Sequence, residues 1–178
     1  MAYVLGFFTA DGSMMKNKRG AHFIEFHIVD REVLVKIRDC MNSNHKISYR
    51  KPTKSSYADS YRLQFGSKEM FEDLIDLGMT QNKSLTLDFP SVPGEFLSDF
   101  VRGYFDGDGC ISYGRYESKD RKNPRWMIST RFTSGSKNFL LALHKKLKEV
   151  CMNGGFIVDK NRGHELAYSA RDSLALYR

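Results

Sequence analysis

The sequence predicts an α+β fold made of two equivalent halves, each with the order helix, strand pair, helix, strand pair, helix. Three observations predict it: a motif that occurs twice, apolar residues at helical spacing after capping residues, and stretches rich in β-branched and aromatic residues that are typical of hairpins. The two halves are predicted over residues 1–89 and 90–178. The two helices that carry the motif are expected to pack against each other. The strands of each half are expected to be antiparallel.

The repeated motif opens each half as a helix that ends in an acid. The segment YVLGFFTADG at residues 3–12 recurs as FVRGYFDGDG at residues 100–109, an offset of 97. In each copy two small residues stand four apart, and an Asp-Gly pair follows the second: these are Gly6, Ala10 and Asp11 in the first copy and Gly103, Gly107 and Asp108 in the second. Small residues four apart share one helix face, where another backbone can approach closely. We therefore expect the two carboxylates to meet at the bottom of a helix–helix interface.

The remaining elements follow in the same order in each half. Asp30 and Ser136 are predicted to cap helices near 31–42 and 137–151. Hairpins are predicted near residues 13–28, 45–66, 110–134 and 156–169. A further helix over 68–78 closes at Gly78, and Ser84 to Pro93 connects the halves. The counterpart of that helix would begin near Arg171, close to the last residue, so the second half is expected to end differently or to be truncated.

Composition and missing motifs narrow the function. The formal charge of +7 and the isoelectric point near 9.3 favour a polyanionic partner. Three cysteines without a CxxC pair argue against a disulfide scaffold or a zinc ribbon and favour a reducing compartment. Without a signal peptide or membrane span, the expected location is the cytoplasm or an organelle matrix, not the exterior. The chain has no HExxH, GxxxxGK[ST] or GxSxG motif, which argues against a metal site built on a close histidine pair, a phosphate-binding loop of that type and a serine hydrolase. His27 and Cys40 are expected to pack in the core, and His144 to lie on a helix surface.

The two motif acids predict a metal site. Each carboxylate stands at the negative end of a helix dipole, and a second carboxylate nearby repels it. A hard divalent cation such as Mg²⁺ offsets both effects by binding carboxylate and carbonyl oxygens. A single Asp-Gly after a helix is usually a cap or a turn, and the EF-hand pattern fails here at Cys110. The second copy in the same register favours metal-assisted phosphodiester chemistry in a basic protein.

The paired motifs resemble those of the LAGLIDADG homing endonucleases in their single-chain form. The resemblance spans both motifs, the hairpins and the segment from Gly78 to Ser84. It implies two αββαββα units, a saddle of antiparallel strands in the DNA major groove, and cleavage of one strand by each motif acid across the minor groove. Asp11 and Asp108 would then be catalytic and would bind Mg²⁺, with Mn²⁺ or Ca²⁺ able to substitute in binding. The carbonyls of Ala10 and Gly107 are candidate further ligands, and Lys83 is a candidate catalytic lysine.

The resemblance also implies the partner. It implies a monomer, often intron-encoded, acting on a long, pseudo-palindromic target in double-stranded DNA and on no membrane. Residues 1–89 carry 13 basic and 11 acidic side chains, and residues 90–178 carry 15 and 10. Basic residues interleaved with aromatic ones in the predicted hairpins are the candidate DNA contacts. They are Lys16, Lys18, Arg19, Lys46, Arg50, Lys51, Lys54, Arg62, Arg115, Lys119, Arg121, Lys122, Arg125 and Arg131.

Two other functions remain open at this stage. LAGLIDADG-like domains also occur in intron-splicing maturases and in DNA-binding regulators, which bind nucleic acid without cutting it. Retention of both motif acids favours the nuclease. A piece of an intein is the third possibility, but the chain opens with Met-Ala and ends with Tyr-Arg, which are not splice-junction residues.

Overall fold

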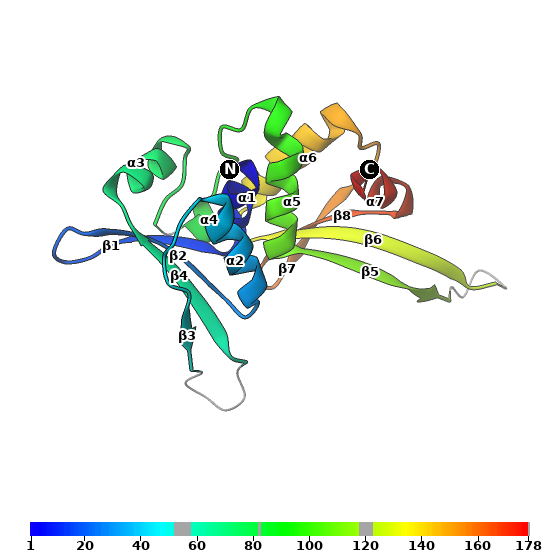
Figure 1. The fold of residues 1–178 in the computed structure, drawn as a ribbon. Coiled ribbons are helices and arrows are strands. Elements are labelled where there is room, and N and C mark those ends of the chain that lie inside the picture. Colours follow the sequence, from blue (N-terminus) through cyan, green and yellow to red (C-terminus); the bar gives the residue numbers. More distant parts are fainter. Residues whose placement is uncertain (52–57, 82, 118–122, 178) are drawn as a thin grey trace. The chain divides into compact units, whose positions relative to one another are not determined.

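The computed structural model describes residues 1–51, 58–81, 83–117 and 123–177 (Figure 1). The predicted fold class is confirmed: the structure is α+β, with two four-stranded antiparallel sheets and the order helix, two strands, helix, two strands, helix in each half. Contacts divide the chain into two compact units, Met1–Gln81 with Pro90–Gly107 and Asn82–Phe89 with Asp108–Arg178. The second motif helix is therefore grouped with the first sheet, although the sequence repeat assigns it to the second half. The boundary at residues 89 and 90 stays a prediction.

The first unit contains both motif helices and one sheet. The strand order is β1-β2-β4-β3, and every pair is antiparallel. Its elements are α1 (Ala2–Asp11), β1 (Gly12–Lys16), β2 (His22–Ile28), α2 (Arg31–Cys40), β3 (Ser48–Arg50), β4 (Ser60–Gly66), α3 (Lys68–Asp76), the 3₁₀ helix η1 (Gly94–Phe96) and α5 (Leu97–Asp108), whose last residue lies in the second unit.

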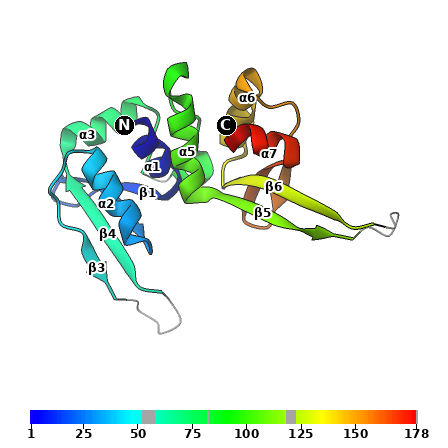
Figure 2. The same ribbon diagram turned by 45° about the vertical axis from the view of Figure 1, so that its right-hand side comes forward.

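The second unit repeats this sheet topology. The strand order is β5-β6-β8-β7, again with antiparallel pairs throughout. Its elements are α4 (Lys83–Thr86), β5 (Gly109–Tyr116), β6 (Arg125–Ser134), α6 (Lys137–Val150), β7 (Phe156–Lys160), β8 (Gly163–Tyr168) and α7 (Ala170–Tyr177). Helix α7 is the counterpart of α3 and begins at Ala170, next to Arg171, where the sequence predicts that counterpart. Figure 2 shows α6 and α7 against the sheet of this unit.

Local capping explains where the helices begin and end. The Asp30 carboxylate accepts the backbone N–H of Glu32 at 2.9 Å and caps α2, as its position in the sequence predicts. The Ser136 hydroxyl accepts the N–H of Phe139 at 3.3 Å at the start of α6. Helix α3 is followed by Gly78 with φ +93°, a conformation that L side chains rarely adopt.

One face of each sheet is buried beneath helices. In the first unit Met14, Ile24, Phe26, Leu63 and Phe65 alternate with more exposed residues and face the core. In the second unit Phe132, Leu166 and Tyr168 do the same, against Phe139, Leu140 and Leu143 of α6. No helix among the described residues covers the opposite face of either sheet. By strand register that face presents polar side chains, such as Glu25 and Arg131, and exposed apolar ones, such as Met15 and Phe156.

Three expectations from the sequence are wrong at the level of single side chains. His27 is exposed and its ring contacts the Ser60 hydroxyl at 2.9 Å, because it lies on the helix-free side of β2. Cys40 is exposed at the end of α2. His144 is half-buried and its Nδ1 lies 2.7 Å from the Tyr168 hydroxyl. Among the residues described, no helix is both long and apolar enough to cross a membrane.

Candidate active site and nucleic-acid interface

The two motif helices of the first unit meet at their glycines. A Cβ atom on Gly6 would overlap the carbonyl oxygen of Phe100 and lie 2.8 Å from the backbone nitrogen of Tyr104. A Cβ atom on Gly103 would overlap the carbonyl oxygen of Tyr3. Since Tyr3 and Phe100 are separated by the same offset as the two glycines, the contact is reciprocal. Each helix therefore accepts the other's main chain at the point where it lacks a side chain.

The acid of the first motif lies beside the last small residue of the second motif. Asp11 is the last residue of α1 and is exposed. A Cβ atom on Gly107 would lie 3.2 Å from Oδ2 of Asp11 and would overlap the Cβ of Ala10. The absence of a side chain at Gly107 thus allows Ala10 and the Asp11 carboxylate to approach α5 closely. Asp108 follows Gly107 in the chain and is the last residue of α5.

The donor atoms at these two helix ends suit a hard cation. Within the described residues there is no group of three or more His, Cys, Asp or Glu side chains that could hold a metal ion. The side chains of the motif acids and the carbonyls of Ala10 and Gly107 are oxygen donors, the type of ligand that Mg²⁺ prefers. Lys83 begins α4, and its side chain lies outside what the structure describes.

A hydrogen bond joins the motif helices close to these acids. The hydroxyl of Tyr3 donates to Oδ2 of Asp106 at 2.7 Å. The guanidinium carbon of Arg102 lies 5.3 Å from the centre of the Tyr3 ring, and the same guanidinium pairs with Asp99 at 3.2 Å. Burial and the hydrogen bond to Asp106 raise the pKa of Tyr3 well above its usual range. The sequence analysis did not predict this hydrogen bond. The available signal was that the second motif has Asp106 at the position where the first motif has Thr9.

The helix-free face of the first sheet carries a closed polar network. Arg62 Nη1 lies 3.5 Å from Oε2 of Glu25, and its Nη2 donates to Oε1 of Gln64 at 2.9 Å. Gln64 in turn donates to Glu25 at 3.1 Å. The side chains of Arg62 and Glu25 are 29% and 12% exposed, so the guanidinium is held in place at a surface that solvent still reaches.

The second sheet has a related pair with acid and base exchanged. Nη1 of Arg131 on β6 lies 3.6 Å from Oε1 of Glu165 on β8, which also contacts the ammonium of Lys160 at 3.6 Å. Arg131 aligns with Glu25 when the strand pairs are superposed by their registers, and Glu165 aligns with Arg62. The acid stands on the inner strand β2 of one sheet and the base on the inner strand β6 of the other. The two sheets therefore present different chemistry at equivalent positions.

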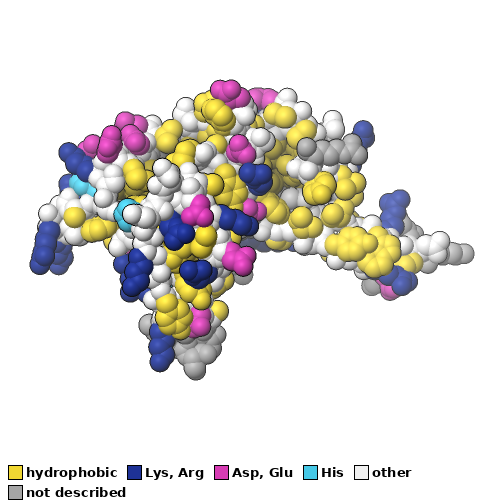
Figure 3. Space-filling model, in the orientation of Figure 1, with side chains coloured by type: hydrophobic (Ala, Val, Ile, Leu, Met, Phe, Trp, Pro, Cys, Tyr) yellow, Lys and Arg dark blue, Asp and Glu magenta, His cyan; other side chains and the backbone are white. Residues whose placement is uncertain are grey.

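The other basic candidates are spread along the strands and turns. By strand register, Arg50 and Arg125 lie on the helix-free faces with Arg62 and Arg131. Lys16 and Arg115 lie on the opposite faces, the same sides as Met14 and Thr130. Lys18 and Arg19 are in the β1–β2 turn, and Lys46 and Lys51 flank β3. Figure 3 shows blue side chains gathered at the β1–β2 end and along β3 and β4. Lys54, Lys119, Arg121 and Lys122 lie outside the described residues.

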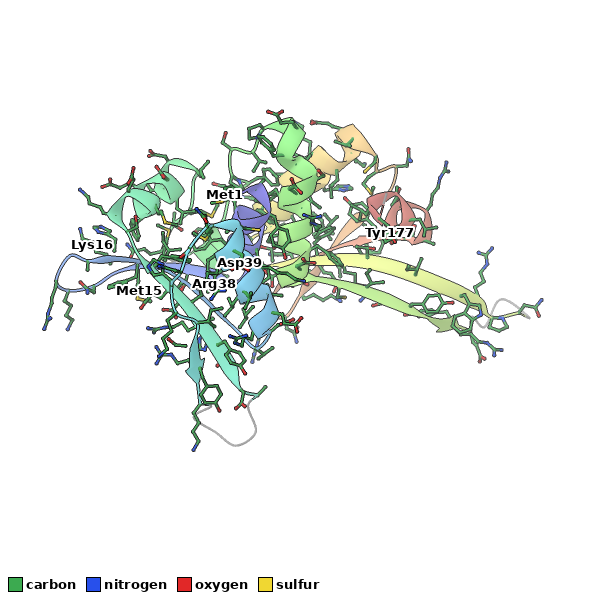
Figure 4. The ribbon with its side chains drawn as sticks, in the orientation of Figure 1. Met1, Met15, Lys16, Arg38, Asp39 and Tyr177 are labelled. Carbon is green, nitrogen blue, oxygen red and sulfur yellow. The ribbon has the colours of Figure 1, made fainter. Side chains whose placement is uncertain are left out.

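Side-chain placement on the first unit can be followed in Figure 4. Met15 and Lys16 are neighbours on β1, and their side chains point to opposite faces because they are consecutive in a strand. Arg38 and Asp39 pair with each other at 3.1 Å on α2.

Two exposed aromatic side chains stack on the second sheet. The ring centres of Tyr113 on β5 and Trp126 on β6 lie 5.0 Å apart, and both side chains are more than half exposed.

Residues 1–76 match a protein family described as LAGLIDADG-like domain. Over 130 residues the chain is 28% identical to the DNA-directed RNA polymerase subunit Rpo1C of Methanocaldococcus jannaschii. That match covers 71% of this chain but 14% of the subunit, so the chain spans about one seventh of that relative's length.

Solved structures with the same fold cover nearly the whole chain. The meganuclease I-SmaMI bound to uncleavable DNA has a TM-score of 0.59 at 15% identity, with 98% of this chain and 80% of that chain aligned. The meganuclease I-AabMI bound to uncleaved DNA gives 0.60 at 14% identity, with 96% and 79% aligned. The N-terminal LAGLIDADG domain of DUF199/WhiA gives 0.60 at 15% identity, with 98% and 77% aligned. At these identities the similarity shows the fold.

Proposed function

We propose that this chain, which has the LAGLIDADG fold and whose residues 1–76 form a LAGLIDADG-like domain, is a site-specific endonuclease that cuts both strands of double-stranded DNA with a divalent metal ion. The target is a long, pseudo-palindromic sequence, and one chain supplies both motifs, so the active form is a monomer. I-SmaMI and I-AabMI, two proteins of this fold, are meganucleases bound to DNA.

The placement of Asp11 carries the proposal. Its carboxylate ends the first motif helix, is exposed, and lies beside a residue that has no side chain. A carboxylate at a helix C-terminus is unfavourable by itself, and a cation with oxygen ligands offsets that cost. Asp108 ends the second motif helix in the same way.

In the proposed reaction, each part of the site has its own role. A bound Mg²⁺ would supply Lewis-acid stabilisation of the charge that develops on the scissile phosphate and would lower the pKa of a water molecule. Asp11 and Asp108 would hold the cation, with the carbonyls of Ala10 and Gly107 as further oxygen donors. Lys83 neutralises charge on the phosphate. The helix-free faces of the two sheets bind the DNA: arginines such as Arg62 and Arg131 contact phosphates or guanine edges.

Cleavage of a DNA library by the purified protein tests the proposal. Plasmids carrying randomised inserts are incubated with Mg²⁺, with Ca²⁺ and with chelator, and the ends of linear products are sequenced. We expect linear DNA cut at discrete sites in Mg²⁺ alone. Asp11→Asn and Asp108→Asn should abolish double-strand cleavage while DNA affinity is retained, and Glu95→Gln, at an exposed acid of η1, should cut normally. Full cleavage by either motif variant, or cleavage in chelator, would refute the assignment.

One observation favours a second function. The structural neighbour from DUF199/WhiA is described as a LAGLIDADG domain and not as a nuclease. The alternative is therefore a LAGLIDADG-type nucleic-acid binder that does not cut, such as an intron maturase or a DNA-binding regulator. Binding without cleavage in both Mg²⁺ and Mn²⁺ would support it, and a filter-binding comparison of folded intron RNA with duplex DNA would separate the maturase from the regulator.

A further inference from the structure

The motif helices are related by the repeat, but one polar contact between them is not. Tyr3 and Phe100 are equivalent positions, and so are Thr9 and Asp106. The Tyr3 hydroxyl donates to Asp106 at 2.7 Å. The symmetric bond cannot form, because Phe100 has no hydroxyl and is fully buried. The hydroxyl of Thr9 instead donates to the carbonyl of Leu5 in its own helix at 2.7 Å.

The surroundings of Tyr3 keep its hydroxyl in place as a donor. The ring is half-buried, and Arg102 lies over it at 5.3 Å while pairing with Asp99. A phenol is protonated at neutral pH, and burial and the contact with Asp106 raise the pKa of Tyr3 further. Asp106 is exposed, and a carboxylate in the last turn of a helix is disfavoured by the dipole. The hydroxyl of Tyr3 offsets that effect and ties the turn to α1.

The turn of α5 that Tyr3 contacts also contains the second motif acid, Asp108. Asp106 precedes Gly107, beside which the Asp11 carboxylate lies, and Asp108 ends the same helix. The last turn of a helix lacks part of its hydrogen bonding and frays readily. An additional bond two residues before its end restricts that motion.

We propose that Tyr3 and Asp106 are positioning residues, whose hydrogen bond fixes the last turn of α5 against α1 and so places Asp108 for cleavage of its own DNA strand. The inference rests on the proposed nuclease function. It makes the two motif acids unequal, because the equivalent bond cannot form between Phe100 and Thr9. Loss of the bond slows cleavage of one strand and leaves the other strand and DNA affinity nearly unchanged.

A linear duplex containing the target, with a different fluorophore on each strand, gives the two strand-cleavage rates in one experiment. In Tyr3→Phe and Asp106→Ala, we expect one strand to be cut at least roughly tenfold more slowly, the size of effect that small misplacement of a catalytic group produces. The double variant should be no slower than either single variant, because both remove the same bond. Asp106→Asn should retain most of the rate, since its amide oxygen accepts from Tyr3. Glu95→Ala, at an exposed acid of η1, controls for the loss of a negative charge.

The outcomes separate this inference from the function on which it rests. Equal slowing of both strands, or additive effects in the double variant, would overturn the positioning role while the wild type still cuts. A wild type that binds DNA and cuts neither strand would overturn the proposed function, and the inference with it. Melting temperatures of all variants are measured in parallel, and Asp106→Asn keeps the test decisive if Asp106→Ala folds poorly.

Discussion

The carbonyl oxygen of Phe100 occupies the position where a side chain on Gly6 would begin. The reciprocal contact places the carbonyl of Tyr3 against Gly103. In both directions a glycine of one helix meets the main chain of the other, which brings the helices closer than side-chain packing allows. The packing of the two helices therefore requires glycine at positions 6 and 103. It depends much less on the side chains of Phe100 and Tyr3, because the glycines contact the main chain of these residues.

Enlarging either glycine should destabilise the first unit. Gly6→Ala and Gly103→Ala each force the helices apart, and we expect a loss of about 1–3 kcal/mol in the free energy of unfolding, the range seen for overpacked cores. Gly94→Ala is the matched control, because nothing lies within 4 Å of its Cβ position and its φ is not positive. Urea unfolding followed by circular dichroism measures all three. A stable Gly6→Ala protein would show that the helices can separate freely.

Arg62 should contribute to DNA binding and Arg38 should not. Both arginines are 29% exposed and both pair with a carboxylate, but Arg62 lies on the helix-free face of the sheet and Arg38 on α2. Replacing a phosphate-contacting arginine reduces the slope of log K against log[salt] by about one. Fluorescence anisotropy over a salt series should show this change for Arg62→Ala and an unchanged slope for Arg38→Ala. Equal slopes would place the DNA elsewhere.

Asp172 should stabilise the second unit through two backbone N–H groups. It is 4% exposed, and its carboxylate accepts from Asn153 and Gly154 at 3.0 Å each, which holds the segment after α6. Asp172→Ala leaves both donors without this partner, and we expect a loss of about 2–3 kcal/mol in unfolding free energy. Asp159→Ala, at an exposed acid that pairs with Lys137 and His164, should lower the unfolding free energy much less, because solvent screens these pairs. Thermal and urea unfolding compare the two variants.

His144 should make the stability of the second unit depend on pH. Burial and the nearby Lys148 lower the pKa of His144 from the usual 6.5. As the pH falls through 6.5, the imidazole is protonated in the unfolded chain before it is protonated in the folded chain. The free energy of unfolding therefore decreases as the pH falls below 6.5, and the contribution of His144 is fully present above that pH. Unfolding curves at pH 7.5 and 5.5 should show this loss in the wild type and less of it in His144→Gln. His27→Gln, at an exposed histidine, should leave the difference unchanged.

The sequence was sufficient to predict the fold because its signals are local or repeated. The doubled motif located both helices, and Asp30 and Ser136 are caps that act within three residues. Hairpin residues of high strand propensity gave the four strand pairs. The position of helix α7 followed from the repeat, which placed its start near Arg171, but the repeat gave no length for it, and the helix runs for eight residues, Ala170–Tyr177.

The side-chain partners at the candidate site needed the structure. Glu25 and Arg62 are 37 residues apart, and their meeting depends on the register between β2 and β4, which no local signal fixes. For the same reason, Arg131 could be proposed as a DNA contact while its partner Glu165 could not. Tyr3 and Asp106 meet across two helices. The metal-binding roles of Asp11 and Asp108 stay predictions, because they depend on the binding of an ion.

The exchange of acid and base between the sheets also bears on misfolding. A chain with two similar halves can pair a strand of one half with a strand of the other, a common error in repeat proteins. If β2 paired with β8 in the native register, Glu25 would stand near Glu165, and pairing of β6 with β4 would bring Arg131 near Arg62. Like charges on neighbouring strands oppose such pairing, whereas each correct sheet joins opposite charges. The two ion pairs therefore help each strand to find the partner from its own half while the chain folds.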